Sequence, residues 1–347
     1  MVKRAPFTLI QLAIKSISIK STRAIINRKT ELLKSIDRPS LTKNLKPVTL
    51  MANIANAIDL AVATKYKANG VGLLRTEFLL MDRTTAPTEE EQFLFYKKVI
   101  TTFPHHSTTI RTFDMGGDKI IPYINMAKEE NPFLGVRAIR LCLKECNDLF
   151  QSQLRAILRA SVFGKCQIMI PMITTLEEIM AVKANLAKAQ QSLQQNNIAY
   201  DTTIKLGIMV ETPAAAIMAD VFAAYVDFFS IGTNDLIQYV MAADRQNGGL
   251  NELSHFYNPS VFRMISMVSN AAKHAKIEVS VCGSMARDPL SIIALLSAGI
   301  DKLSMGPNHL LSVKKFIGTI DTEKLSTIYN ELLVTKNKQE YLEILSK

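Results

Sequence analysis

The sequence predicts an α/β fold, a (β/α)8 TIM barrel that follows a short basic leader. Eight short apolar runs alternate with segments of helical spacing, and no repeat or linker interrupts the series. Each parallel strand needs a crossover helix, so eight such units favour a closed barrel. An open doubly wound sheet is the alternative, but no GxGxxG motif follows a strand. The expected strands cover 48–53, 70–74, 108–114, 167–172, 205–211, 226–232, 277–282 and 299–305.

The composition is that of a globular protein. Of the 347 residues 48% are apolar, which is enough to form a sizeable hydrophobic core. We expect two parts: a basic leader at 1–44, helical or partly disordered, and one barrel at 45–347. No apolar stretch approaches the roughly 18 residues that span a bilayer, so we expect a soluble chain with no membrane partner. The cysteines form no CxxC pair. We interpret Cys142 and Cys146, on one helix face, and Cys166 as structural thiols in a reducing cytoplasm.

The net charge of +10 is concentrated at the start of the chain. Residues 1–48 hold eleven Lys and Arg residues against Glu31 and Asp37, so the rest of the chain is nearly neutral. This segment has no aromatic interleaving beyond Phe7, and we therefore expect no nucleic-acid partner. A transit peptide, which has a similar Ser-rich and acid-poor composition, is a second interpretation of the leader.

Arginines follow the expected strands in the first half of the barrel. The second and third strands lead into Arg75 and Arg111, and Arg137 follows a turn-like Asn-Pro pair. Guanidinium groups bind phosphate or carboxylate through paired, charge-assisted hydrogen bonds. Together with Arg245, these residues therefore predict a site for a small polyanion. Ordinary surface arginines, or a helix salt bridge in the case of Arg137, are the alternatives.

Helical periods fill the gaps between the expected strands. Apolar residues recur at intervals of three and four, most clearly after the fourth and sixth strands. The two repeats are Leu176, Ile179, Met180 and Leu186, and Val261, Met264, Ile265 and Val268. Such segments supply the crossover helices that parallel strands require.

The fifth and sixth expected strands end on acidic residues. One ends at Glu211, and the other is followed by Asn234 and Asp235. The carboxyl ends of barrel strands share one rim, where two carboxylates can supply oxygen ligands to Mg²⁺ and leave its other positions to water and substrate. The alternative is that the carboxylates only balance the arginines. Thr212 and Pro213 are expected to begin the next helix.

The seventh expected strand ends at Cys282, directly before Gly283. An apolar setting keeps a thiol protonated, which suits it to give up a proton rather than to attack. A buried structural cysteine is the alternative interpretation.

Several motifs occur in the order typical of one known family. They are Arg75-Thr-Glu-Phe-Leu, Pro87-Thr-Glu-Glu-Glu-Gln92, Arg111-Thr-Phe-Asp-Met-Gly-Gly-Asp-Lys119, Glu130-Asn-Pro-Phe-Leu-Gly135, Val210-Glu-Thr-Pro213 and Gly232-Thr-Asn-Asp235-Leu. Over about residues 45–320 the chain resembles the phosphoenolpyruvate-binding barrel of enzyme I, the phosphoenolpyruvate-protein phosphotransferase of the bacterial sugar phosphotransferase system.

The resemblance implies a role for each candidate site residue. It implies that the phosphate is gripped by Arg75, Arg111 and Arg245. It implies that Mg²⁺ is held by Glu211 and Asp235, and that Asn234 helps to hold the substrate. It further implies that Cys282 protonates the enolate carbon as pyruvate forms, with Arg137 nearby. A homodimer is expected on the same ground.

The sequence also departs from that family. The phosphoacceptor histidine of the family lies in a separate domain, in a Gly-rich Thr-Ser-His context that this chain lacks. His255 follows a serine but matches a barrel segment of the family. Ser284 and Arg287 stand where the family typically has Glu and Gly, and the loop after Tyr257 is shortened.

Three functions are therefore in competition. The first is a catalytic domain that transfers phosphate from phosphoenolpyruvate to a histidine-bearing domain in trans. The second is a truncated or catalytically impaired remnant that binds phosphoenolpyruvate without turnover. The third is a fragment of pyruvate phosphate dikinase or phosphoenolpyruvate synthase, which the two motifs around Pro87 and Asn131 disfavour.

Overall fold

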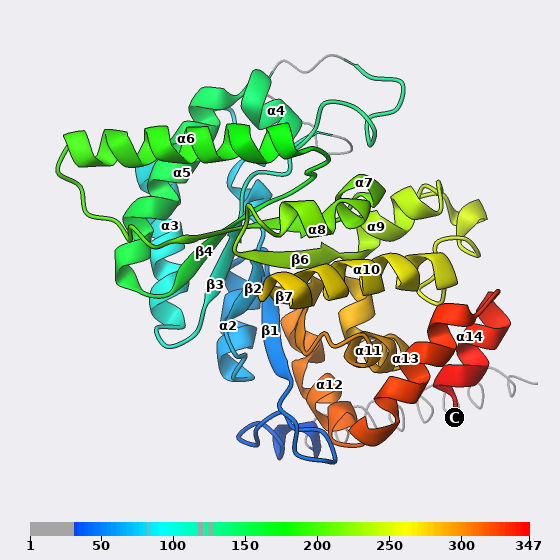
Figure 1. Cartoon of the computed structure of the whole chain (residues 1–347). Coiled ribbons are helices and arrows are strands. Elements are labelled where there is room, and N and C mark those ends of the chain that lie inside the picture. Colours follow the sequence, from blue (N-terminus) through cyan, green and yellow to red (C-terminus); the bar gives the residue numbers. More distant parts are fainter. Residues whose placement is uncertain (1–30, 82, 117–120, 122, 125–127) are drawn as a thin grey trace, which may run out of the picture.

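The computed structural model describes residues 31–81, 83–116, 121, 123–124 and 128–347. Its centre is a closed barrel of eight parallel strands in chain order, which confirms the predicted (β/α)8 fold (Figure 1). The strands are β1 (Thr49–Ile54), β2 (Val71–Leu74), β3 (Thr108–Arg111), β4 (Cys166–Ile170), β5 (Lys205–Val210), β6 (Phe228–Gly232), β7 (Glu278–Cys282) and β8 (Lys302–Met305).

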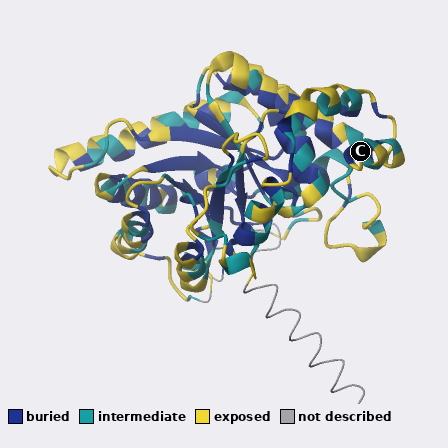
Figure 2. Cartoon of the chain, turned by 90° about the horizontal axis from the view of Figure 1, so that it is seen from below, coloured by how far each residue is buried: buried dark blue, intermediate teal, exposed yellow. Residues whose placement is uncertain are grey.

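The ring closes through its first and last strands. Thr49 of β1 pairs with Lys302 of β8, and Ala52 pairs with Met305. The strands β2, β3, β4 and β6 are buried along their whole length, and Figure 2 shows this buried centre inside helices whose outer faces are exposed. Burial on both faces explains why these strands are continuous apolar runs.

The third strand is shorter than predicted. β3 ends at Arg111, and Thr112 still donates its N–H to the carbonyl of Met169, but the next two N–H groups donate to side chains. Phe113 donates to Oε1 of Gln153 at 3.0 Å, and Asp114 donates to Oε1 of Glu77 at 3.1 Å. These side chains draw the backbone out of the sheet, toward the rim.

Helices surround the barrel, and several of them begin at side-chain caps. Thr88 and Thr175 form capping boxes, and Thr212 caps α7 with Pro213 in its first turn, as predicted. The α-helices are α2 (Ala57–Lys65), α3 (Glu89–Thr102), α4 (Ile139–Lys144), α5 (Asn147–Ala160), α6 (Leu176–Gln195), α7 (Pro213–Ile217), α8 (Ala219–Phe222), α9 (Thr233–Val240), α10 (Pro259–Ala275), α11 (Pro289–Ser297), α12 (Leu310–Ile317), α13 (Leu325–Val334) and α14 (Lys338–Leu345).

Part of the expected leader packs on the barrel. Residues 1–30 lie outside the described residues, but Leu32, Leu33 and Ile36 pack against the core. Nζ of Lys314 donates to the carbonyl oxygens of Ile36 and Arg38, each at 3.1 Å. Ile36 and Arg38 thus contact α12, and a domain boundary at residue 45 stays a prediction.

The cysteines are all free and buried. The prediction that Cys142 and Cys146 share one helix face is wrong, because α4 ends at Lys144 and Cys146 stands at the start of α5. Across the described part of the chain, no helix has the length and apolarity needed to cross a membrane.

Candidate functional site

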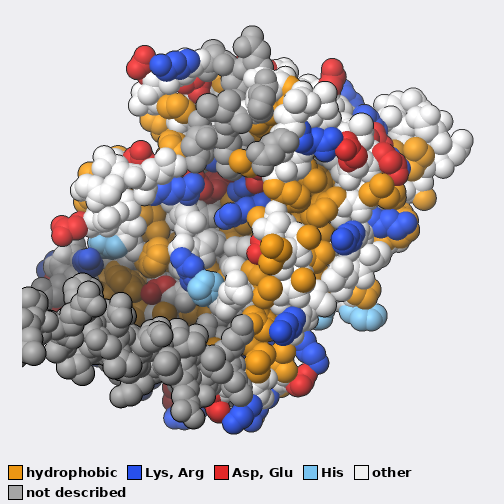
Figure 3. All heavy atoms as spheres, turned by 180° about the vertical axis from the view of Figure 1, so that it is seen from behind, with side chains coloured by type: hydrophobic (Ala, Val, Ile, Leu, Met, Phe, Trp, Pro, Cys, Tyr) orange, Lys and Arg blue, Asp and Glu red, His pale blue; other side chains and the backbone are white. Residues whose placement is uncertain are grey.

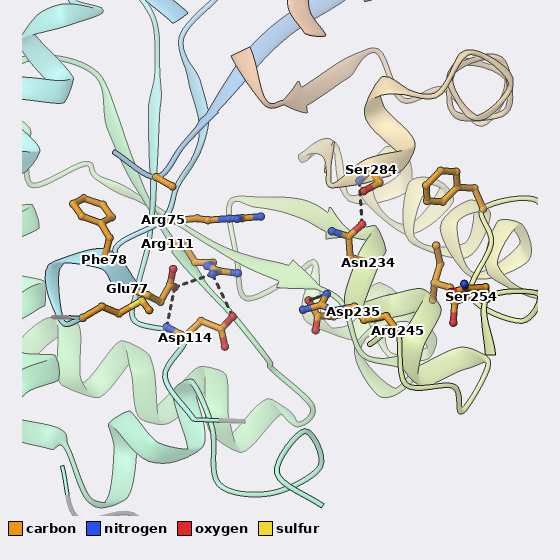
Figure 4. A pocket seen from close by; sticks show the side chains of 15 residues that line it. Arg75, Glu77, Phe78, Arg111, Asp114, Asn234, Asp235, Arg245, Ser254 and Ser284 are labelled. Atoms are coloured by element: carbon orange, nitrogen blue, oxygen red, sulfur yellow. Dashed lines mark hydrogen bonds and ion pairs between the residues drawn. The ribbon is translucent and has the colours of Figure 1, made fainter. Parts of the chain in front are cut away.

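A cavity of about 520 Å³ opens at the carboxyl ends of the strands. Figure 4 shows its polar side chains converging from two sides. Figure 3 shows basic, acidic and histidine side chains together in a hollow of the face it displays. One side of the cavity carries Arg75, Glu77, Arg111 and Asp114, and the other carries Asn234, Asp235, Arg245, Ser254 and Ser284. Five of the predicted site residues therefore line one cavity: Arg75, Arg111, Asn234, Asp235 and Arg245.

Two of the predicted arginines are held in a buried ion-pair network. Nη2 of Arg111 lies 2.7 Å from Oε1 of Glu77 and 3.2 Å from Oδ2 of Asp114. Nη2 of Arg137 lies 2.8 Å from Oδ1 of the same Asp114, and its Nη1 lies 3.5 Å from Oδ1 of Asp235. Nε of Arg111 and Nε of Arg137 are both buried without a hydrogen-bond partner among the described residues. The guanidinium planes are thus fixed in place before any ligand binds.

The other two arginines are more open. Arg75 directly follows β2, is exposed, and its guanidinium makes no hydrogen bond or ion pair with the described residues. In Figure 4 it extends into the space between Arg111 and Asn234. Nη1 of Arg245 lies 3.3 Å from Oδ2 of Asp235. These two cations are available to an anionic ligand without breaking a buried pair.

Each of the two predicted metal ligands keeps one buried oxygen without a hydrogen-bond partner among the described residues, although Nη1 of Arg137 lies 3.5 Å from that of Asp235. Glu211 follows β5, is fully buried, and its Oε1 accepts the N–H of Met172 at 2.8 Å. Its Oε2 and Oδ1 of Asp235 accept no hydrogen bond from any residue that the structure describes. Burial, and then the negative charge of Asp235, raise the pKa of Glu211 to about 8.

A cation fits this pair of carboxylates. Buried carboxylate oxygens without partners are costly unless they are protonated or meet a positive charge. Among the described residues there is no cluster of three or more His, Cys, Asp and Glu placed to hold a metal ion. Two carboxylates that leave further positions to water and substrate oxygens are the arrangement usual for Mg²⁺ at phosphate sites.

Cys282 does not line the cavity. It ends β7, is buried, and packs inside the barrel with Met169 and Met209. Its Sγ accepts from the hydroxyl of Ser230 and donates to the carbonyl of Ile231, both at 3.7 Å. Burial raises the pKa of this thiol to about 11, so the thiol is protonated at neutral pH.

Asn234 is oriented by the loop after β7. Its Oδ1 accepts the N–H of Ser284 at 3.0 Å. A Cβ atom on Gly283 would lie 2.5 Å from Oγ1 of Thr233, and this glycine has a φ of +114°. Only glycine allows this close approach in that backbone conformation.

Sequence reasoning missed the acidic partners of the arginines. Glu77 stands two residues after Arg75, and Asp114 stands three after Arg111. Their positions just beyond the ends of strands were the signal that could have indicated acidic partners for the arginines. Tyr239 gave no such signal. Its hydroxyl donates to the carbonyl of Phe133 at 2.5 Å and accepts from Nη1 of Arg137 at 3.1 Å, which ties α9 to the segment before α4.

His255 is half-buried and stacks near Tyr257, with ring centroids 6.4 Å apart. It does not line the cavity, whereas its neighbour Ser254 does. The geometry thus gives no support to His255 as a phosphate acceptor.

Comparison with known proteins gives matches that cover nearly the whole barrel. The family described as "PEP-utilising enzyme, PEP-binding domain", in which PEP denotes phosphoenolpyruvate, matches residues 29–322. A phosphoenolpyruvate-protein phosphotransferase from Geobacillus stearothermophilus is 45% identical over 320 residues, which are 92% of this chain and 55% of that protein. Its namesake from Bacillus subtilis (strain 168) is 43% identical over 317 residues, 91% of this chain and 55% of that protein.

A third phosphotransferase of the same name, from Staphylococcus aureus (strain MSSA476), is 43% identical over 318 residues, 92% of this chain and 55% of that protein. Among solved structures, a citrate lyase from Burkholderia xenovorans LB400 has a TM-score of 0.47 at 15% identity and covers 87% of this chain and 91% of that one. A likeness of that degree says nothing about the chemistry of this chain.

The chain spans about half the length of the curated phosphotransferases that it matches. Because the family match covers most of the chain, including every candidate site residue, the chain belongs to the PEP-binding domain family of phosphoenolpyruvate-utilising enzymes.

Proposed function

We propose that the chain binds phosphoenolpyruvate with Mg²⁺ and transfers its phosphoryl group to a histidine on a separate domain, releasing pyruvate. One observation carries the proposal: three arginines line the same cavity as Asp235, one of two carboxylates that have an unsatisfied buried oxygen. The names of the relatives favour this function over a dikinase fragment.

The arginines supply the binding of the phosphate. Arg75 and Arg245 are open to the cavity, and Arg111 is held rigid by Glu77 and Asp114. Preorganised cations stabilise the charge that spreads over a transferring phosphoryl group, and losing one such contact typically costs a factor of about 10² to 10³ in rate. Asn234 and Arg137 complete the proposed substrate contacts.

Glu211 and Asp235 are the proposed Mg²⁺ ligands. When bound, Mg²⁺ would neutralise charge on the phosphate and on the enolate oxygen. Glu211 follows β5 and Asp235 lies in the first turn of α9, which follows the neighbouring strand β6, and Glu211 is fixed by the N–H of Met172. Arg137 and Arg245 flank Asp235 and limit how far its carboxylate can turn.

The transfer leaves an enolate that must gain a proton. The bond between the phosphorus and the enol oxygen breaks, a phosphorus–nitrogen bond to the acceptor imidazole forms, and the enolate takes up one proton at its methylene carbon. Cys282 is the proposed donor, since its raised pKa keeps the thiol protonated.

The acceptor must come from elsewhere, because no histidine lines the main cavity within the described residues. We propose a histidine-bearing phosphotransferase domain as the partner in trans, a homodimer of this chain, and a cytoplasmic location. Each follows from the family relationship rather than from a contact within the chain.

The decisive experiment supplies the missing acceptor. The portion of the Bacillus subtilis relative that this chain does not match would be incubated with this chain, Mg²⁺ and ³²P-labelled phosphoenolpyruvate. Label should appear on the added domain and pyruvate in solution, and Arg111→Ala should abolish both. Binding of phosphoenolpyruvate by calorimetry without any label transfer would instead identify the chain as a binding module.

A further inference from the structure

A smaller cavity of about 250 Å³ adjoins the main one at the ends of β1, β7 and β8. Its wall includes Arg287 and His309, to which the proposed function assigns no role. The two cavities share Arg75, Asn234, Ser284 and Ala55. A ligand in the side cavity would therefore lie next to a ligand in the main one.

Arg287 and His309 form a hydrogen-bonded pair. Nη1 of Arg287 lies 2.9 Å from Nε2 of His309. A guanidinium can only donate, so Nε2 accepts and the neutral imidazole carries its proton on Nδ1. Burial, and then the charge of Arg287, lower the pKa of His309, in keeping with that tautomer. Arg287 has no other partner among the described residues, so its remaining N–H groups stay available.

The charge around the side cavity is predominantly positive. Arg75 and Arg287 are both exposed, and the guanidinium of Arg75 makes no hydrogen bond with a described residue. Asp59 is the one carboxylate in the lining. Its Oδ2 accepts the N–H of Ala55 at 3.0 Å, so this carboxylate serves the start of α2. Two guanidinium groups and an imidazole thus face a single, already engaged carboxylate.

We propose that the side cavity is a second oxyanion subsite, which holds one phosphate group between Arg287, His309 and Arg75. The phosphate is either free or part of a monoester, because both present the same oxygens. The planar fork of a guanidinium group pairs with two oxygens of a phosphate, so a phosphate between Arg287 and Arg75 is held by charge-assisted hydrogen bonds. The subsite does not depend on the phosphotransferase activity.

The shared arginine gives the subsite a regulatory consequence. Arg75 can orient toward only one anion at a time, and two anions in adjoining cavities repel each other. Phosphate in the side cavity should therefore weaken the binding of phosphoenolpyruvate in the main one, and by linkage the reverse should hold with the same factor.

The test follows His309 directly. In protein with ¹³C-labelled histidine, the pKa of each imidazole is measured by NMR as inorganic phosphate is added, and His309→Gln assigns the resonance. An anion within about 4–6 Å favours the charged imidazole, so the pKa of His309 should rise by about half a unit or more and saturate. His274, which is exposed and lines neither cavity, is the internal control.

Arg287→Ala is the matched variant. It should remove the response of His309 to phosphate while leaving the affinity for phosphoenolpyruvate, measured without phosphate, unchanged. The proposal is overturned if His309 responds no more than His274, or responds equally in Arg287→Ala. A parallel titration with methyl phosphate separates the sources: an equal response means that a monoester fits, and a response to inorganic phosphate alone restricts the subsite to the free ion.

Discussion

A Cβ atom on Gly232 would lie 2.9 Å from Oε2 of Glu211 and 2.9 Å from its Cβ. Gly232 ends β6 with an ordinary φ of −86°, so space rather than backbone conformation demands glycine here. The absent side chain leaves room for the unsatisfied carboxylate oxygen beside the strand that leads to Asp235. The two proposed metal ligands are thus brought together by a residue that is not itself a ligand.

Gly232→Ala should weaken metal binding. The added methyl group must push the Glu211 carboxylate aside, and we expect the affinity for Mn²⁺, used as a probe for Mg²⁺ in electron paramagnetic resonance titrations, to fall about tenfold or more. Gly248→Ala is the control, since a Cβ atom there meets nothing within 4 Å. Equal affinities in both variants would contradict the proposed role of Glu211.

The pH dependence should identify Glu211. Its pKa of about 8 in the folded protein lies above the ordinary 4.5, so the metal-free protein favours the protonated carboxyl. This contribution to stability is fully present below about pH 4.5 and is lost as the pH rises toward 8. Urea unfolding of the metal-free protein should show that loss, and Glu211→Gln should lack it.

Metal binding should follow the opposite trend. The cation needs the ionised carboxylate, so Mg²⁺ affinity should rise about tenfold per pH unit up to about pH 8 and then level off. Calorimetry in buffers of different ionisation enthalpy would count the proton released. Mg²⁺ affinity that is flat between pH 6 and 8 would rule out Glu211 as a ligand with this pKa.

Two arginines should differ in what their loss does to the fold. Arg111→Ala leaves Glu77 and Asp114 buried with one cation fewer, and we expect the free energy of unfolding to fall by about 3–5 kcal/mol. Arg245→Ala breaks one more exposed pair and should cost about 1 kcal/mol or less. Urea titrations give the stabilities, and calorimetry should show weaker phosphoenolpyruvate binding in both.

Cys282→Ala should slow pyruvate formation by a factor of about 10² to 10⁴ if the thiol is the proton donor. Cys166→Ala is the matched control, because this thiol is also buried and its pKa is also raised. Pyruvate is followed by coupling to lactate dehydrogenase, with the histidine-bearing domain added. Undiminished pyruvate release in Cys282→Ala would assign the proton to another donor or to water.

Tyr239→Phe should loosen the segment that carries Arg137. The variant loses the hydrogen bonds to the carbonyl of Phe133 and to Nη1 of Arg137, and we expect the KM for phosphoenolpyruvate to rise about tenfold. Tyr200→Phe, whose hydroxyl accepts from the exposed Gln194, is the control. A fall in kcat with unchanged KM would point to a role in the transition state instead.

The sequence predicted the barrel because its strands are short apolar runs that alternate with segments of helical spacing. Strand ends were harder to predict, as in β3, where side chains of Gln153 and Glu77 accept the N–H groups of Phe113 and Asp114 in place of backbone carbonyls. No local pattern reveals that exchange, since Gln153 lies forty residues further along the chain. The same holds for α4, which ends before Cys146.

The residues of the candidate site were predictable where a strand delivers them to the rim. Arg75 follows β2, Arg111 ends β3 and Asp235 lies in the first turn of α9 after β6, and the barrel brings them to one cavity. The links between them were not predictable: Asp114 joins Arg111 to Arg137, and Tyr239 reaches across from α9. Such links join residues on different elements, so they exist only once those elements are packed.

The pairing of Thr49 with Lys302 has a consequence for how the protein is made. Nearly the whole chain must leave the ribosome before β8 can close the ring against β1. Contacts between residues so distant in sequence form slowly, because the loop they close costs entropy before it yields any contact. The complete cavity wall, to which β2, β3 and β6 contribute on one ring, is therefore a late product of synthesis, and its ligands should stabilise the finished barrel rather than guide its assembly.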